Sequence, residues 1–183
     1  ITRKLVATAA PGTYVTACKP GMTGKGIRSE FTVTDSGADL TPTGETGEQL
    51  QAATEQYGAY VRDQSEQLVA ATQAFVEVYK AGDDETARST YAPTRMHWER
   101  IEPVAESFGD LDPRLDLREA DLEAGQTWTG WHRIEKDLWP PATGYTALTT
   151  AERATLADQL LADTRELHDR IQKLTYTPDQ LGN

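Results

Sequence analysis

The chain has 183 residues, of which 38% are hydrophobic and 26% are charged, and its formal net charge is −11 at pH 7. This length and composition allow one sizeable hydrophobic core with a small appendage. So acidic a surface argues against nucleic acids and anionic membranes as partners, because both would repel it, and it suits cations.

The charge is unevenly distributed along the chain. Residues 1–36 contain five Lys or Arg and only two Asp or Glu, so the net negative charge lies in residues 37–183. No apolar run of 18 residues occurs, and no membrane span is predicted. The first residues, ITRKLVATAAPG, are too short and too polar for a complete signal peptide. The single cysteine, Cys18, leaves no partner for an internal disulfide.

The first residues of the chain alternate in the manner of β-strands. β-Branched and aromatic residues recur at period two, and Pro11-Gly12 and the glycine-rich KPGMTGKG interrupt them. We predict three short strands, near residues 3–8, 13–18 and 28–34. Strands with so few large apolar side chains cannot close a core of their own. We therefore expect residues 1–36 to be the last strands of a β-domain whose beginning is missing.

The pattern changes after a polar segment rich in Gly, Thr and Asp, residues 37–48, which is predicted to be a linker. The apolar residues that follow fall at helical spacing and predict an amphipathic helix of roughly 30 residues or more. AGDD at residues 81–84 is predicted to end it. A second helix is predicted from about residue 84 to about residue 107, with a kink or a fresh start at Pro93.

The remaining residues are predicted to be helices joined by turns. FGDLDPRLD is predicted to be a turn, and residues 128–139 a helix that Pro140-Pro141 ends. Thr149 and Glu152 have the spacing of a capping box, which begins a long helix with an apolar stripe. Residues 49–183 are therefore predicted to form an antiparallel helical bundle, and the chain to be mainly α.

Three polar pairs with a spacing of three residues stand close together in this region. They are Glu99/Glu102, Asp116/Glu119 and His132/Glu135. Residues three apart share a face of an α-helix. Hard and borderline cations prefer several carboxylate oxygens and an imidazole, which helical bundles supply from separate helices. A metal site is one interpretation of the pairs.

The alternative interpretation is structural. Pairs of this kind on an acidic helix commonly form a solvated face, and they occur by chance. Glu102 and His132 lie beside bulky apolar residues, so a buried charge there needs a partner. Four arginines of this region could provide salt-bridge partners in place of a metal: Arg95, Arg100, Arg118 and Arg133. Spacing alone leaves both interpretations open.

Hydrolase signatures are weak. The chain has three histidines and no H-E-x-x-H, and none of its serines has the context of a nucleophile elbow. Cys18 and Met22 have the spacing of the ligand loop of blue-copper domains, but no histidine precedes residue 97. A complete copper site is therefore excluded within this segment, and Cys18 is either a small packed residue or a partial metal ligand.

A family resemblance adds to these observations. YAPTRMHWERIEPVAESFGDLDPRLDLREADLEAGQTWTGWHRIEKDLW, residues 91–139, closely resembles the imelysin-like domain of EfeO-type iron uptake proteins. GWHRIE, residues 130–135, matches the G-x-H-x-x-E motif of the wider imelysin family. PGTYVTACKPG, residues 11–21, resembles the last strands of the cupredoxin-like domain that precedes it in these proteins.

The resemblance implies a non-catalytic, extracytoplasmic or periplasmic protein that binds iron, Fe²⁺ or Fe³⁺, with zinc or copper as alternatives. Its partners would be the iron permease and the peroxidase-like component of the same uptake system. The family's proposed metal ligands fall on Glu99, Glu102, Asp116, His132 and Glu135. Glu119 becomes a secondary candidate, and Cys18 is carried over as a ligand of the cupredoxin-like module.

The resemblance also implies an incomplete chain. We expect the cupredoxin-like domain to lack its beginning, which could include a membrane anchor, and a further acidic motif of the helical domain to follow Asn183. Two other functions stay open: a metal-dependent peptidase of the imelysin family, and a module that binds acidic polysaccharide through a bridging cation.

Overall fold

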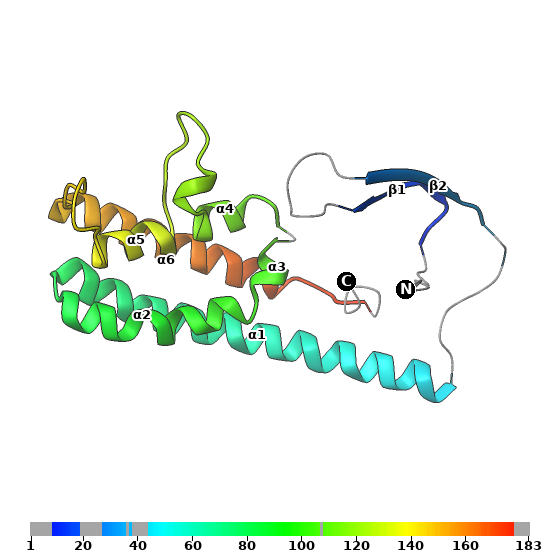
Figure 1. Cartoon of the computed structure of the whole chain (residues 1–183). Coiled ribbons are helices and arrows are strands. Elements are labelled where there is room, and N and C mark those ends of the chain that lie inside the picture. Colours follow the sequence, from blue (N-terminus) through cyan, green and yellow to red (C-terminus); the bar gives the residue numbers. More distant parts are fainter. Residues whose placement is uncertain (1–8, 19–26, 36, 38–43, 107, 178–183) are drawn as a thin grey trace. The chain divides into compact units, whose positions relative to one another are not determined.

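The computed structural model describes residues 9–18, 27–35, 37, 44–106 and 108–177. The chain forms two compact units, residues 1–47 and residues 48–183. A two-stranded antiparallel sheet lies in the first unit, and the second is helical (Figure 1). The predicted class, mainly α with a short β segment, is confirmed. In chain order the elements are β1 (Gly12–Cys18), β2 (Ile27–Val33), α1 (Gly44–Ala81), α2 (Asp84–Glu99), α3 (Glu102–Glu106), α4 (Leu111–Asp116), the 3₁₀ helix η2 (Glu119–Asp121), α5 (Trp131–Leu138) and α6 (Thr150–Ile171).

The two strands form a hairpin whose register places Gly12 opposite Val33 and Cys18 opposite Ile27. Tyr14 and Phe31 face each other across it and stack with ring centroids 5.7 Å apart. Two of the predicted strands are thus confirmed, and the one expected near residues 3–8 lies outside the described residues. That this hairpin belongs to a cupredoxin-like domain stays a prediction.

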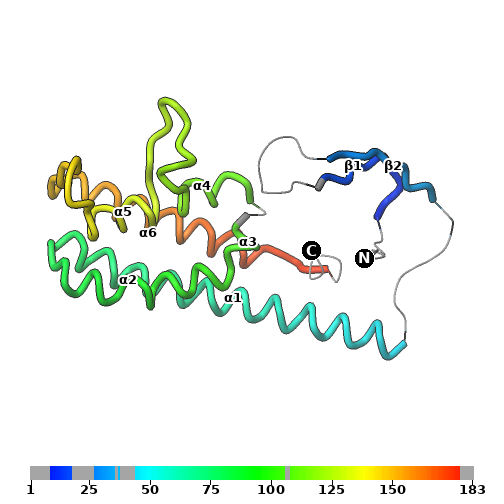
Figure 2. Tube along the Cα trace, in the orientation of Figure 1, coloured from blue at the N-terminus to red at the C-terminus, as the bar shows by residue number. Residues whose placement is uncertain are grey.

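The long helices are built largely as their periodicity predicts. α1 begins at Gly44, inside the segment whose composition predicts a linker, because residues 45–50 are mostly good helix formers. In Figure 2, α2 runs back along α1, and the ring Nδ1 of His97 on α2 lies 3.0 Å from Gln64 Oε1 on α1. The capping box predicted at Thr149 and Glu152 begins α6.

The second helix differs from its prediction. α2 passes through Pro93 without ending and stops at Glu99, and a separate short helix, α3, begins at Glu102. Pro103 explains the break, because its nitrogen has no hydrogen to donate to the Glu99 carbonyl. Ile101 lies in the turn between the helices and is fully buried, so the chain is held in its bent course.

Aromatic side chains from three helices meet in the core. Phe75 of α1, Tyr91 of α2 and Trp131 of α5 have ring centroids 5.6–5.9 Å apart in every pair. Such contacts between large rings contribute more than their buried area alone. Trp131 is fully buried, so the first turn of α5 is fixed against α1 and α2.

A strap of three residues before α5 holds that helix against the end of α4. Trp128 Nε1 donates to the Leu117 carbonyl at 2.7 Å, and Thr129 Oγ1 donates to the Arg114 carbonyl at 2.9 Å. Gly130, the N-cap of α5, has a φ of +82°. A Cβ at this glycine would lie 2.7 Å from the Arg114 carbonyl oxygen and would overlap that of Leu115. The close approach of the two helices therefore requires glycine here.

The inner face of α5 is fixed by a buried carboxylate, Asp137. Its Oδ2 accepts hydrogen bonds from Tyr79 Oη and from Arg153 Nε, both at 2.8 Å, and its Oδ1 accepts one from Tyr145 Oη at 2.6 Å. Burial by itself raises the pKa of this carboxyl, but these donors together lower it. Asp137 thereby ties α5 to α1 through Tyr79 and to α6 through Arg153.

We expect Gly130→Ala to lower the free energy of unfolding by more than about 3 kcal/mol, because the positive φ and the overlap with α4 must both be relieved. Urea denaturation would measure the change. Gly125→Ala is the matched control, since Gly125 has a φ of +86° but nothing within 4 Å of an added Cβ. Its expected cost is about 1 kcal/mol. Equal losses in the two variants would contradict the role given to the approach between α4 and α5.

Candidate metal centre

Asp116 and His132 meet where α4 ends and α5 begins. Asp116 is the last residue of α4, and His132 is the second residue of α5. His132 Nε2 lies 3.6 Å from Asp116 Oδ1, and the Asp116 side chain is only 7% exposed. The strap at residues 128–130 brings the two side chains together, although 16 residues separate them in sequence.

The ring of His132 is oriented from its other side. His132 Nδ1 lies 2.8 Å from Glu135 Oε2, one turn further along α5. In the neutral tautomer in which Nδ1–H donates to Glu135, Nε2 carries a lone pair. That Nε2 atom is buried and has no hydrogen-bond partner among the described residues. A buried polar atom without a partner is costly and invites a ligand. This carboxylate–histidine arrangement is the one that orients imidazoles toward metals.

Arg95 of α2 occupies the other side of Asp116. Its Nη2 donates to Asp116 Oδ2 at 2.8 Å, and its Nη1 forms an ion pair with Oδ1. Its Nε lies 2.7 Å from Glu99 Oε1, one turn along α2. The salt-bridge interpretation that the sequence left open is therefore realised for Asp116 and Glu99.

Glu102 lies close enough to Glu99 and Asp116 for their negative charges to act on its carboxyl group. Burial raises the pKa of its carboxyl, and the nearby negative charges of Glu99 and Asp116 raise it further. Arg95 opposes this effect, but the pKa stays above its usual value. An additional cation at this position would stabilise the ionised form of Glu102.

Two of the three polar pairs do not share a helix. Glu99 is the last residue of α2 and Glu102 the first of α3, so the expectation of a common helical face is wrong for them. It is also wrong for Asp116 and Glu119, which α4 and η2 contribute separately. Turns between short elements, which spacing alone does not reveal, place these residues.

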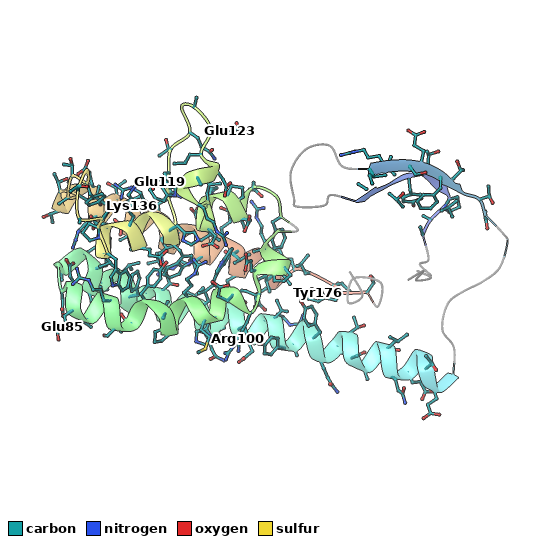
Figure 3. The ribbon with its side chains drawn as sticks, viewed as in Figure 1. Glu85, Arg100, Glu119, Glu123, Lys136 and Tyr176 are labelled. Atoms are coloured by element: carbon teal, nitrogen blue, oxygen red, sulfur yellow. The ribbon has the colours of Figure 1, made fainter. Side chains whose placement is uncertain are left out.

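The positions of the other candidates are as follows. Glu119 pairs with Lys136 of α5, and both lie on the same side of the bundle in Figure 3. Cys18 ends β1, but its side chain is outside what the structure describes, as is Met22 altogether. Within residues 9–18, 27–35, 37, 44–106 and 108–177, no three His, Cys, Asp or Glu side chains are arranged to hold a metal ion as they stand.

Two cavities border the cluster. One, of about 400 Å³, adjoins His132 and Glu135 between Trp128 and Trp139. The other, of about 380 Å³, adjoins Arg95 and Glu99 on α2. Both are open hollows at the surface, and Asp116 lines neither of them.

Sequence reasoning missed Tyr91, which precedes Arg95 by one turn of α2. Its hydroxyl donates to the Trp131 carbonyl at 3.3 Å, next to His132. Burial raises its pKa, as do the nearby carboxylates of Glu135 and Asp116, so the phenol keeps its proton. Its spacing of four residues from Arg95 was the available signal, but a tyrosine at that position is also ordinary core.

The family model that matches this chain covers the part that contains the cluster. The imelysin family model matches residues 53–181. The chain is 40% identical to an iron uptake system component EfeO of Yersinia pestis over 183 residues, which cover 98% of the chain and 46% of the relative. An EfeO of Escherichia coli O1:K1 is 38% identical over 185 residues, with the same coverage. An iron uptake system component EfeM of Bacillus subtilis is 47% identical over 147 residues, 78% of the chain and 37% of the relative. The chain thus spans less than half the length of these relatives.

We expect Glu102→Gln to raise the midpoint of thermal unfolding of the metal-free protein at pH 7. Because the pKa of Glu102 is raised by folding, the wild type loses stability as the pH rises from about 4 through that raised pKa. The amide cannot ionise, so the variant avoids this loss. Thermal scans between pH 4 and pH 7 would measure it.

Glu123→Gln is the matched control, because this substitution removes the same charge from a glutamate that lies in an exposed loop (Figure 3). A stabilisation of equal size in the control would show that net charge, and not the crowding at Glu102, is responsible.

Proposed function

The chain belongs to the imelysin family, and on this premise we propose that it binds iron at the cluster around Asp116 and His132 as a non-catalytic component of iron uptake. The relatives that it matches are named as iron uptake components and not as enzymes. In this proposal iron is the cargo of the protein.

The observation that carries the proposal is the environment of His132 Nε2. This atom is buried, lacks a hydrogen-bond partner among the described residues and lies 3.6 Å from a carboxylate oxygen of Asp116. In the tautomer in which Nδ1–H donates to Glu135, Nε2 and the Asp116 oxygen are two electron-pair donors that face each other, an arrangement that a cation stabilises. Imidazole nitrogen and carboxylate oxygen together suit Fe²⁺, and zinc is the main competitor for such ligands.

We assign the remaining acidic residues by their contacts. Glu135 holds Nδ1 of His132 and would orient the ring toward the ion. Glu102, whose ionised form is destabilised by its neighbours, would gain most from an added positive charge. Glu99, whose side chain is half-exposed, would complete the oxygen ligands from the solvent side. Cys18 would belong to a second metal site in a cupredoxin-like module.

The same relatives support a proposal for the setting of the protein. We propose an extracytoplasmic or periplasmic protein that works with an iron permease and a peroxidase-like component. No helix among the described residues is long and apolar enough to cross a membrane. The net charge of −11 would attract cations to the surface before they reach the centre.

The peptidase alternative has less support from the geometry. A zinc peptidase needs a carboxylate free to act as general base beside the metal-bound water. The carboxylate closest to His132 is Glu135, and it is already engaged with Nδ1. Binding of acidic polysaccharide would require a cation to bridge two negatively charged surfaces.

We expect His132→Ala and Asp116→Asn each to weaken Fe²⁺ binding by more than about 100-fold, because the loss of a residue that only orients a ligand already costs about 10–100-fold. Glu135→Gln should fall within that smaller range. Anaerobic titration calorimetry would measure the affinities, with circular dichroism to confirm that the helices are retained.

His97→Ala is the matched control, since His97 contacts Gln64 on α1 and lies outside the cluster. Unchanged affinity in both ligand variants would contradict the assignment. Cleavage of a protein substrate by the zinc-loaded wild type, lost in Glu135→Gln, would favour the peptidase.

A further inference from the structure

Arg95 holds the very carboxylate that the proposed function needs for iron. Its side chain is 13% exposed, and its guanidinium engages both oxygens of Asp116, one of them at 2.8 Å. Asp116 Oδ1, the oxygen that faces His132 Nε2 at 3.6 Å, is also the one paired with Arg95 Nη1. The carboxylate is therefore fully occupied by a cation that belongs to the chain.

A metal ion and this guanidinium exclude each other at Asp116. An ion held between Asp116 and His132 would stand directly beside a fixed positive charge, and the repulsion is strong because the site is largely removed from water. Arg95 cannot become a ligand in compensation, since a guanidinium has no lone pair to offer. The ion can bind well only when Arg95 leaves Asp116.

A hollow on the surface of α2 lies beside the Arg95 side chain. The hollow of about 380 Å³ on α2 is open to solvent, and its lining is Tyr91, Ala92, Arg95, Met96, Glu99 and Arg100. Glu99 already contacts the Nε of Arg95, and its side chain is 49% exposed. The guanidinium can therefore turn from the buried carboxylate of Asp116 into a space that is open to solvent.

Resting on the proposed function, we propose that Arg95 is an internal cation that competes with iron for Asp116 and so sets the affinity of the centre. While no ion is bound, Arg95 neutralises Asp116 and keeps α2 attached to the end of α4. An incoming ion displaces it, and the return of Arg95 to Asp116 favours release of the ion. Arg95 is thus an affinity-determining residue and not a ligand.

The test compares Arg95→Met with Arg100→Met. Both remove one positive charge close to the end of α2, where Figure 3 labels Arg100. Arg100 donates to Gln64 Oε1 at 3.0 Å and not to the cluster. With Fe²⁺ alone as the probe, under anaerobic conditions, we expect Arg95→Met to lower the dissociation constant about tenfold or more, because the competing cation is gone. Arg100→Met should change it by less than about threefold, since its charge is exposed and screened.

The dependence of thermal unfolding on Fe²⁺ supplies a second measurement, because a merely structural loss in the variant would be the same with and without Fe²⁺. Metal-free Arg95→Met should unfold at a lower temperature than the wild type, because Asp116 loses its partner. Saturating Fe²⁺ should remove this difference, since the ion then replaces the guanidinium. A deficit that persists in the presence of Fe²⁺ would overturn the proposal.

The possible outcomes separate the two proposals. If the wild type binds Fe²⁺ and Arg95→Met binds it equally or more weakly, the role of Arg95 is overturned and the proposed function stands. If neither protein binds Fe²⁺, both are overturned. Should Arg95→Met not fold, Arg95→Gln keeps an N–H donor for Asp116 without the charge, and the same tightening is expected.

Discussion

The close approach of α5 to the end of α4 is the constraint on which the rest of the centre depends. At Gly130 the chain has no room for a side chain against the backbone of Arg114 and Leu115. Only because this contact forms does the first turn of α5 place His132 beside Asp116. The aromatic core below α5 and the carboxylate of Asp137 then hold the helix in that position. The glycine of the G-x-H-x-x-E motif is thus as much a part of the site as its histidine.

Repulsion between negatively charged carboxylates is the second constraint on this region. Several carboxylates converge on a partly buried space, where burial favours their neutral forms. Arg95 resolves the conflict for Asp116 and Glu99, whereas the raised pKa of Glu102 shows that it is not fully resolved. A protein that must bind and release a cation gains from such an arrangement. Under the proposed function, the site would stay folded without an ion, and a bound ion would relieve the remaining repulsion.

How far the sequence predicts this structure depends on whether the signal is periodic. The strands of the hairpin, the length of α1 and the capping box of α6 all follow from local patterns. The break at Pro103 and the ends of α4 do not, because short helices are fixed by packing and not by periodicity. The candidate residues were found by their type and by family resemblance, but the spacing argument misplaced two pairs of them. The contact between Arg95 and Asp116 joins separate elements, so local spacing could only suggest it.

The described residues of the cluster all lie between Tyr91 and Glu135, on α2, α3, α4 and α5. The longest helices, α1 and α6, contribute the supporting core and several ion pairs, among them the buried pair of Arg153 with Asp137. Demands on the chemistry of the site and demands on the stability of the bundle therefore act on different stretches of the chain. Substitutions on α1 and α6 that keep Phe75, Tyr79 and Arg153 should therefore leave the proposed ligands in place. An engineer could exploit the same division, re-designing the two long helices as a scaffold around an unaltered 91–135 segment.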